Sequence, residues 1–353
     1  MVEFLLLLLR FILFVGGYCL KLGASIINLR TSSFLLGRLF SKWVSFETEH
    51  CSVFAKIALE SVWDYKSSIE ITKDWNGIDQ VSLYGGQVTS WRNDRGEELL
   101  FTSSKYNTSN AFILLIFMPT IVLFGNCGLL EQHGFARNKI WTIDDNPPPL
   151  HLNETHGKSF IDLLLKPSEE DLFEFRLRVS IVSDGNLVLI SRIRNINGKP
   201  FSFSFAYHTY LSVSAISEVR IEGLETLDYL DNLRQRNRFT EQGDSITFES
   251  ELDQVYLSSP NCIAVLDHER KQTFVVRKEG LPDIVVWNPW EKKSKSMVDL
   301  GDEEYKQMLC VDGAAIEKPI TLKPGEEWTG RLELAVVPLS FCSEDLDPHM
   351  RFF

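Results

Sequence analysis

Two polar side chains on separate segments of the chain could form an acid/base pair. His208 lies in the aromatic segment Phe201–Val213, and Asp312 lies far downstream, shortly before the turn at Pro324-Gly325. A histidine and a carboxylate that meet in one site can donate and accept protons at neutral pH. Glu317 is a second candidate for the carboxylate. The sequence therefore predicts acid/base chemistry at His208 with Asp312, or at His208 with Glu317.

The spacing of these residues indicates which faces of the strands they occupy. Strand alternation places the aromatic side chains from Phe201 to Tyr207 on one face, and the small side chains ending in His208 on the other. A face of small residues leaves room for a ligand; the alternative is a core histidine bonded to a backbone carbonyl. The odd offset between Asp312 and Glu317 would point Glu317 to the opposite face of a straight strand, so Asp312 is the first choice of base.

Further candidates for ligand binding are found on loops and strand edges. Gln132, His133 and Arg137 belong to a Gly-flanked segment that could hold a hydroxyl-rich or anionic ligand, or else form a β-bulge with an exposed ion pair. Asp253 could orient a sugar hydroxyl, although acids are also common at exposed strand edges. Trp287 lies close to a turn, where an indole can stack on a sugar or pack in the core.

Composition excludes several classes of protein. The net charge of −12 argues against non-specific nucleic-acid binding, although a few arginines can still make a local pocket for an anionic substrate. The six cysteines show no metal-ligand spacing, which is typical of free thiols in a reducing compartment. The sequence contains no Gly-rich phosphate loop and no His-Glu-x-x-His motif. We therefore expect neither a metal nor a nucleotide cofactor.

The chain divides by composition into three parts. Residues 1–67 form an apolar, irregular extension. Residues 68–340 have the alternating strand and turn pattern of a β domain, and residues 341–353 form a tail. Within the extension, residues 4–27 could be a membrane anchor, an organellar leader or an artefact of the gene model. The apolar run at its start is interrupted by Arg10 and is short for a spanning helix. We expect a cytoplasmic monomer, with an organellar or membrane-anchored protein as the alternative.

Residues 68–340 have the pattern of antiparallel strands. Short runs with period-2 alternation are separated by turn residues, and helical windows are nearly absent. Five runs show this most clearly: 80–84, 87–91, 173–182, 186–194 and 331–337. So many strands in one stretch predict an all-β fold, a single large β-sandwich. The uncharged segment 111–124 contains Pro119 and is expected to form a buried strand pair.

Several strings together resemble the glucose-6-phosphate 1-epimerase branch of the aldose 1-epimerase (galactose mutarotase) superfamily, in its plant form. The strings run in the family's order over most of the chain, and they are Gly85–Arg92, Glu97–Phe101, Phe124–Gly128, Gln132–Arg137, Phe205–Tyr210, Glu222–Tyr229, Asp253–Tyr256, Val286–Trp290 and Cys310–Asp312. The resemblance implies a large, twisted antiparallel β-sandwich, the mutarotase-like supersandwich, with a shallow site on its concave face. It also implies that no cofactor is needed.

The resemblance further implies a reaction and roles for particular residues. The reaction would interconvert the α and β anomers of a hexose 6-phosphate by acid/base ring opening. His208 corresponds to the family's general acid, Asp253 to the aspartate that orients the substrate, and Gln132, His133 and Arg137 to its sugar-binding loop. Asp312 stands where the family usually has a glutamate, one methylene longer, and such a displacement can cost a rate on the order of 100-fold.

A second departure from the family lies upstream. Where the family has a positively charged segment with an Arg-Gly-Gly-Ile-Pro motif, residues 106–123 contain neither arginine nor lysine. Arg92 and Arg137 are then left to hold the phosphate, and each such contact is typically worth about 1.5–3 kcal/mol. We expect the altered segment to weaken substrate binding. The alternative is a catalytically inactive carbohydrate-binding or assembly protein on the same fold.

Overall fold

Strands make up most of the part of the chain that the structure describes. The computed structural model describes residues 68–72, 78–105, 118–120, 136–150, 157–165, 173–182 and 184–339. All strand pairs in these residues are antiparallel, and the strands form one three-stranded and two eight-stranded sheets. The all-β class and the large antiparallel β-sandwich are therefore confirmed.

We call one of the two large sheets the site sheet and the other the backing sheet. The three-stranded sheet has the order β1 (Ser68–Thr72), β2 (Ile78–Ser82) and β3 (Gln87–Ser90). The site sheet has the order β13 (Asn237–Thr240), β12 (Asp228–Asp231), β14 (Leu252–Tyr256), β17 (Asp283–Asn288), β18 (Met308–Leu322), β9 (Phe201–Ala206) and β4 (Met118–Thr120), with β10 (Tyr210–Ser212) paired to β18. The backing sheet has the order β11 (Val219–Glu222), β15 (Cys262–Asp267), β16 (Gln272–Glu279), β19 (Glu327–Pro338), β8 (Leu187–Asn195), β7 (Phe173–Val182), β6 (Gly157–Leu165) and β5 (Thr142–Ile143).

Helical structure in the described residues is limited to short turns. These are α4 (Trp290–Ser294) and the 3-10 turns η1 (Ala136–Asn138), η2 (Ile216–Glu218), η3 (Asn232–Arg234) and η4 (Glu304–Gln307). Among the described residues, no helix has both the length and the apolar character needed to cross a membrane. The proposed anchor at residues 4–27 lies outside them.

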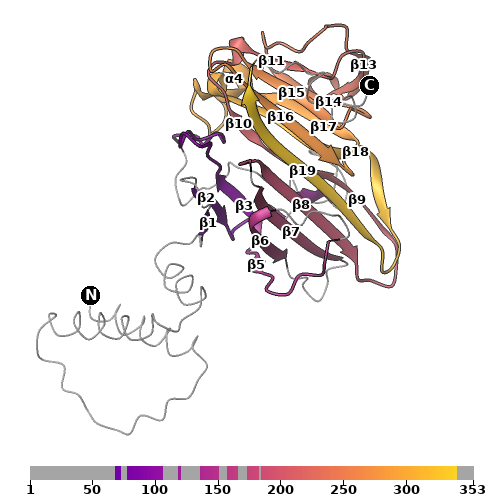
Figure 1. Ribbon diagram of the computed structural model, residues 1–353. Helices are drawn as coiled ribbons and strands as arrows, with labels where there is room; N and C mark the ends of the chain where they lie inside the picture. Colours follow the sequence, from indigo (N-terminus) through magenta and orange to yellow (C-terminus); the bar gives the residue numbers. More distant parts are fainter. Residues whose placement is uncertain are drawn as a thin grey trace, which may run out of the picture. The chain divides into compact units, whose positions relative to one another are not determined.

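Most of the five predicted strand runs match observed strands closely. The run 173–182 coincides with β7, and 186–194 differs from β8 by one residue at each end. Within the apolar segment 111–124, only Met118–Thr120 is described, and it pairs with β9 as β4. Figure 1 shows the long strands of the backing sheet running side by side across the molecule.

Aromatic side chains join the two large sheets. The ring of Phe205 on β9 lies 4.8 Å from that of Trp328 on β19 and 6.4 Å from that of Phe175 on β7. The Tyr207 hydroxyl, just beyond β9, donates to the carbonyl of Gly330 on β19 at 2.9 Å. The predicted aromatic face of segment 201–207 therefore points into the core, because Phe203, Phe205 and Tyr207 are each 1% exposed.

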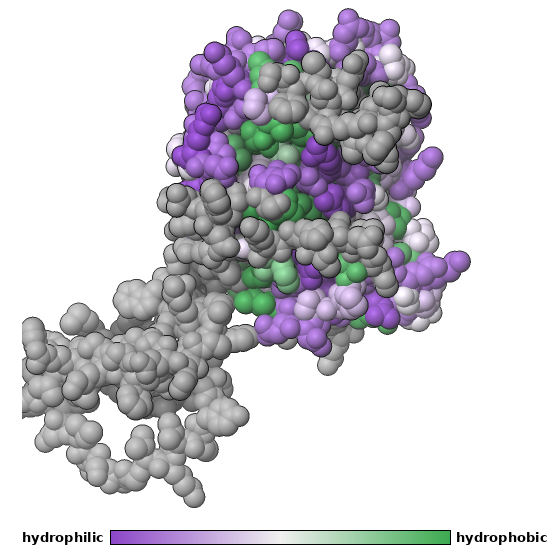
Figure 2. Space-filling model, in the orientation of Figure 1, coloured by the Kyte–Doolittle hydropathy of each residue, from purple (hydrophilic) through white to green (hydrophobic). Residues whose placement is uncertain are grey.

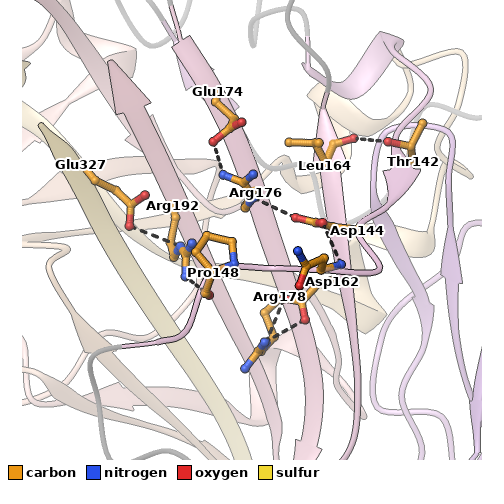
Figure 3. A network of polar contacts seen from close by, with 11 residues as sticks. Thr142, Asp144, Pro148, Asp162, Leu164, Glu174, Arg176, Arg178, Arg192 and Glu327 are labelled. Atoms are coloured by element: carbon orange, nitrogen blue, oxygen red, sulfur yellow. Dashed lines mark hydrogen bonds and ion pairs between the residues drawn. The ribbon is translucent and has the colours of Figure 1, made fainter. Parts of the chain in front are cut away.

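Much of the described surface that faces the viewer in Figure 2 is polar. In the view of Figure 2, hydrophilic residues cover the upper and right-hand edges, and hydrophobic residues show in separate patches between them. On the outer face of the backing sheet, arginines of β7 and β8 are paired with carboxylates (Figure 3): Arg176 with Asp144, Arg178 with Asp162 and Arg192 with Glu327. Arg192 also donates to the carbonyl of Pro148 at 2.9 Å, which ties the segment after β5 across this face.

The contact between β9 and the backing sheet should dominate stability. Replacing Phe205 with alanine removes a buried ring between two sheets, so we expect a loss of about 3–5 kcal/mol in the free energy of unfolding. Phe160→Ala is the matched control, because Phe160 is 55% exposed and only covers the Arg178 guanidinium at 4.5 Å. The Phe160→Ala variant should lose less than about 1 kcal/mol in the free energy of unfolding. Urea unfolding measures both, and equal losses would contradict this account of the core.

Candidate active site

Cross-strand pairing places a set of polar and aromatic side chains on the outer face of the site sheet. Directly paired residues of an antiparallel sheet project to the same side. One row across the sheet consists of Asp253, Trp287, Cys310 and Tyr210. The neighbouring row consists of Val255, Val285 and Asp312. The outer face therefore carries acids and aromatic rings, whereas the inner face of the same strands packs in the core.

His208 and Asp312 meet on this face. The His208 Nδ1 lies 3.0 Å from the Asp312 Oδ2, and the Thr209 backbone N–H donates to the Asp312 Oδ1. The His208 Nε2 lies 3.1 Å from the Tyr210 hydroxyl. The Asp312 side chain is 2% exposed and that of His208 is 18% exposed. His208 thus lies on the outer face of the sheet, at the end of its small-residue strand face, and both of its ring nitrogens contact polar side chains.

This arrangement sets the direction of the hydrogen bonds. An ionised carboxylate can only accept, so Asp312 favours a proton on Nδ1; Nε2 then accepts from the Tyr210 hydroxyl in the neutral imidazole and donates to it in the imidazolium. Burial raises the pKa of Asp312, and the hydrogen bond from His208 opposes that rise. Burial also holds the pKa of Tyr210 well above its usual range, so the hydroxyl stays a neutral donor. The three side chains form a chain in the order Tyr210, His208, Asp312.

An indole forms one wall beside the histidine. The ring of Trp287 lies 6.0 Å from the His208 ring and 5.9 Å from the Tyr210 ring, at 80° to the latter. Trp287 is half-buried, in contrast to the fully buried Trp91 and Trp141. A partly exposed indole beside an acid/base pair offers an apolar face on which a sugar ring could stack.

Asp253 stands at the other end of the same row. Its Oδ1 accepts a hydrogen bond from the Asn232 Nδ2 at 2.6 Å. Burial raises the pKa of Asp253, whereas that hydrogen bond and the charge of His208 lower it. Strand β17, which carries Trp287, lies between β14 with Asp253 and β18 with Cys310 and Asp312. A ligand on the indole would therefore have the Asp253 carboxylate on one side and the Asp312 carboxylate on the other.

Glu317 lies apart from His208, for a reason that the sequence argument did not anticipate. Strand β18 advances five residues between the pairs Ala315–Phe205 and Ile320–Phe203, while β9 advances two, so a bulge interrupts β18. The straight-strand premise for Glu317 is therefore wrong. Its carboxylate pairs with Arg238 on β13 at 3.3 Å. The backbone N–H groups of Ile316 and Glu317 both donate to Asp283.

The bulged segment covers part of the outer face. Ile316 is buried against a small apolar cluster whose other members lie on this face: Ala206, Leu230, Val255, Leu257, Val285 and Ala314. The Glu317–Arg238 ion pair lies at the far edge of that cluster, where β13 is the edge strand of the sheet. Glu317 thus belongs to a wall of the site, and Asp312 is the carboxylate in contact with His208.

The predicted arginines differ in their surroundings. Arg92 pairs with Glu98 at 3.3 Å, in an exposed position. Arg137 lies in η1, and its positive charge lowers the pKa of Tyr210, in partial opposition to burial. Gln132 and His133 lie outside the described residues.

A separate open cleft, with a volume of about 690 Å³, lies away from this site. Side chains of both signs line it, among them Arg95, Glu98, Asp184 and Arg270. Glu98 is already engaged there, since it accepts from the Ser90 hydroxyl at 2.6 Å and the Trp91 backbone N–H at 2.7 Å. No histidine is among the described residues that line this cleft, whereas His208 and Asp312 are in direct contact on the outer face of the site sheet.

Sequence reasoning gave no role to two members of this site. Tyr210 follows His208 by two residues, and Cys310 precedes Asp312 by two, so period-2 alternation alone would have placed each beside its partner. What the sequence did not contain was the register between β10, β17 and β18, which decides that these segments adjoin.

Comparison with known proteins points to one family. The family model described as "Aldose 1-epimerase" matches residues 67–335. A relative from Cenchrus ciliaris named "Putative glucose-6-phosphate 1-epimerase" is 61% identical over 77% of this chain and 85% of its own length. An Escherichia coli protein of the same name is 26% identical over 66% of this chain and 78% of its own length.

A solved structure extends the comparison to the fold. The crystal structure of a "putative mutarotase" from Salmonella typhimurium superposes with a TM-score of 0.66 and 23% identity, and the match covers 77% of this chain and 91% of that one. At this identity the likeness shows the fold alone. Taken with the match of the family model over most of the chain, it leads to one conclusion: this chain belongs to the aldose 1-epimerase family.

Proposed function

We propose that this chain is a mutarotase that interconverts the anomers of a hexose 6-phosphate, with glucose 6-phosphate as the first candidate substrate. The observation that carries the proposal is the contact of a buried carboxylate with a histidine on the outer face of the site sheet, 3.0 Å apart. Family membership supports the reaction class, and the names of two relatives support the phosphorylated substrate.

The proposed reaction needs only proton transfers. Asp312 removes the proton from the C1 hydroxyl, protonated His208 delivers a proton to the ring oxygen, and the C1–O5 bond breaks to give an open-chain aldehyde. Rotation about C1–C2 and reversal of the two transfers close the ring as the other anomer. Because O1 and O5 are both bonded to C1, two catalytic groups that lie side by side can serve them.

Tyr210 and Thr209 hold this pair in place. The Thr209 backbone N–H fixes the Asp312 carboxylate, and the Tyr210 hydroxyl fixes the Nε2 side of the imidazole. We assign Asp253 and Trp287 to the sugar, as the carboxylate that orients a hydroxyl and the surface under the ring. Arg137, whose charge acts on Tyr210, is the first candidate cation for the phosphate, and Arg92, which pairs with Glu98 in an exposed position, is the second.

The same contact between His208 and Asp312 also favours a second function, the binding of a carbohydrate without catalysis. With His208 and Asp312 bonded to each other, each satisfies part of the other's hydrogen-bonding capacity, so a sugar must compete with that bond. A protein that binds a carbohydrate on Trp287 without opening its ring would have the same walls. The first experiment has to separate catalysis from binding.

The central prediction concerns the rate of anomer exchange. The full-length chain should accelerate α/β exchange of glucose 6-phosphate. His208→Ala should lower the accelerated rate by a factor on the order of 10²–10⁴, the usual contribution of acid/base catalysis. His268→Ala is the matched control, because His268 is exposed. Exchange spectroscopy by NMR measures all three rates.

The outcome also separates the two candidate functions. A folded wild-type chain that causes no exchange, yet shifts or broadens the sugar resonances, would favour the binding protein. Equal exchange in the His208 and His268 variants would rule out His208 as the acid.

The raised pKa of Asp312 predicts a pH dependence. The base must be ionised, so kcat/KM should fall on the acid side with a midpoint above about 4, the ordinary range of an aspartate. Measuring exchange rates from acid to neutral pH tests this. A midpoint at or below the ordinary value would contradict the burial argument.

The same shift has a consequence for stability with a definite sign. A folded-state pKa above the unfolded value means that the folded state holds the proton more tightly, so stability is lost as pH rises through the folded pKa. The free energy of unfolding of the wild type, relative to Asp312→Asn, should therefore decrease over that interval. Urea unfolding at several pH values provides the check.

The phosphate contact is tested by substrate comparison. Arg137→Gln should raise KM for glucose 6-phosphate by roughly 10-fold or more, as expected for a lost charge-assisted contact, and leave KM for glucose nearly unchanged. Arg92→Gln should have the smaller effect, because Glu98 shares its charge. If both sugars lose affinity equally, Arg137 does not bind the phosphate.

A further inference from the structure

Three potential metal ligands converge in the candidate site. The nearest ligand atoms of His208, Cys310 and Asp312 all lie within 4.8 Å of one another. Cys310 and Asp312 are alternate residues of β18, so their side chains project to the same side of the site sheet. His208 comes from the segment between β9 and β10, both of which pair with β18. The convergence depends on the fold, since His208 lies 104 residues before Asp312 in the sequence.

The donor set matches a particular class of ion. Imidazole nitrogen, thiolate sulfur and carboxylate oxygen are together the ligands that zinc uses, whereas magnesium and calcium prefer oxygen alone. Bond lengths of about 2.0–2.3 Å place the ligand atoms of tetrahedral zinc roughly 3.3–3.8 Å apart. The His208 Nδ1 and Asp312 Oδ2 are already 3.0 Å apart, and since all the ligand atoms lie within 4.8 Å of one another, no separation has to shorten by more than about 1.5 Å to reach tetrahedral geometry.

The outer contacts of the cluster also suit a bound ion. Metal-ligating histidines usually have their second nitrogen hydrogen-bonded, and the His208 Nε2 lies 3.1 Å from the Tyr210 hydroxyl, which can accept from it. The Thr209 backbone N–H holds the second oxygen of Asp312. His208 is the most exposed of the three residues and gives solvent access, whereas Cys310 is fully buried. Such a site leaves the fourth position for water.

We propose that His208, Cys310 and Asp312 bind one thiophilic divalent cation of the zinc class, and that the bound cation blocks the acid/base pair. The ion takes the place of the proton that His208 and Asp312 share. With both groups coordinated, neither can exchange a proton with a sugar. The binding part of this inference stands on the ligand geometry alone, and the inhibition part rests on the proposed function.

The test uses cadmium as a spectroscopic probe on the full-length chain. Cadmium bound to a thiolate gives an ultraviolet charge-transfer band, and titration should reveal a component that is lost in Cys310→Ser. Cys262→Ser is the matched control, since Cys262 lies on β15 of the backing sheet. His208→Ala and Asp312→Asn should each weaken binding of that component at least tenfold. Thermal unfolding verifies that each variant is folded.

The possible outcomes are separable. A titration that is the same in wild type and Cys310→Ser would overturn the site. The absorption band requires no turnover, so it reports on the metal site even if the chain catalyses no exchange. If exchange does occur, zinc should slow the wild type at least tenfold, with recovery on adding EDTA. Full metal binding with unchanged exchange would refute the inhibition while leaving the binding site in place.

Discussion

The period-2 alternation of the strands around β9 is the constraint on which the rest of the site depends. Phe203, Phe205 and Tyr207 are packed against the backing sheet, where Trp328 and Phe175 fill the space between the layers. Because these rings must face inward, the alternate positions have to face outward, and His208 is the last of them. The hydrophobic layer therefore decides which side of the sheet carries the chemistry, and the polar contacts of His208 then only have to fix its orientation.

Much of this could be read from the sequence, and the physical reasons are specific. Alternation is a local property, so the strands β7 and β8 and the inward aromatic face followed from the residues alone, whereas for His208 the residues left both an outward position and a place in the core open. Pairing between distant strands is not local. The sequence offered both Asp312 and Glu317 as the base, and only the register of β18 with β9 and β17, including the bulge, separates them. The roles of Tyr210 and Cys310 were missed for the same reason.

The bulge in β18 shows how one irregularity serves two purposes. It lifts residues after Ala315 out of the ladder, so that Ile316 covers the apolar cluster on the outer face, and it carries Glu317 to Arg238 at the edge of the sheet. Asp283, buried on the neighbouring strand, accepts both freed N–H groups and so compensates for the lost ladder bonds. An acid that the sequence alone offered as a catalyst thus becomes part of the wall beside His208 and Asp312.

The distribution of charge limits how a phosphorylated sugar could lie in the proposed site. Asp253 and Asp312 are both carboxylates, and a phosphate dianion placed between them would be repelled. Arg137 acts on Tyr210, which holds the Nε2 side of His208. In a hexopyranose, C6 is attached to C5, the carbon that bears the ring oxygen, so the phosphate lies on the side of the ring oxygen. In the proposed orientation, with the ring oxygen at His208 and the C1 hydroxyl at Asp312, the phosphate would extend past His208 and away from the Asp312 carboxylate, and Arg137 is the cation we propose for it. One orientation of the sugar would therefore serve the proton transfers and also keep the phosphate away from Asp312.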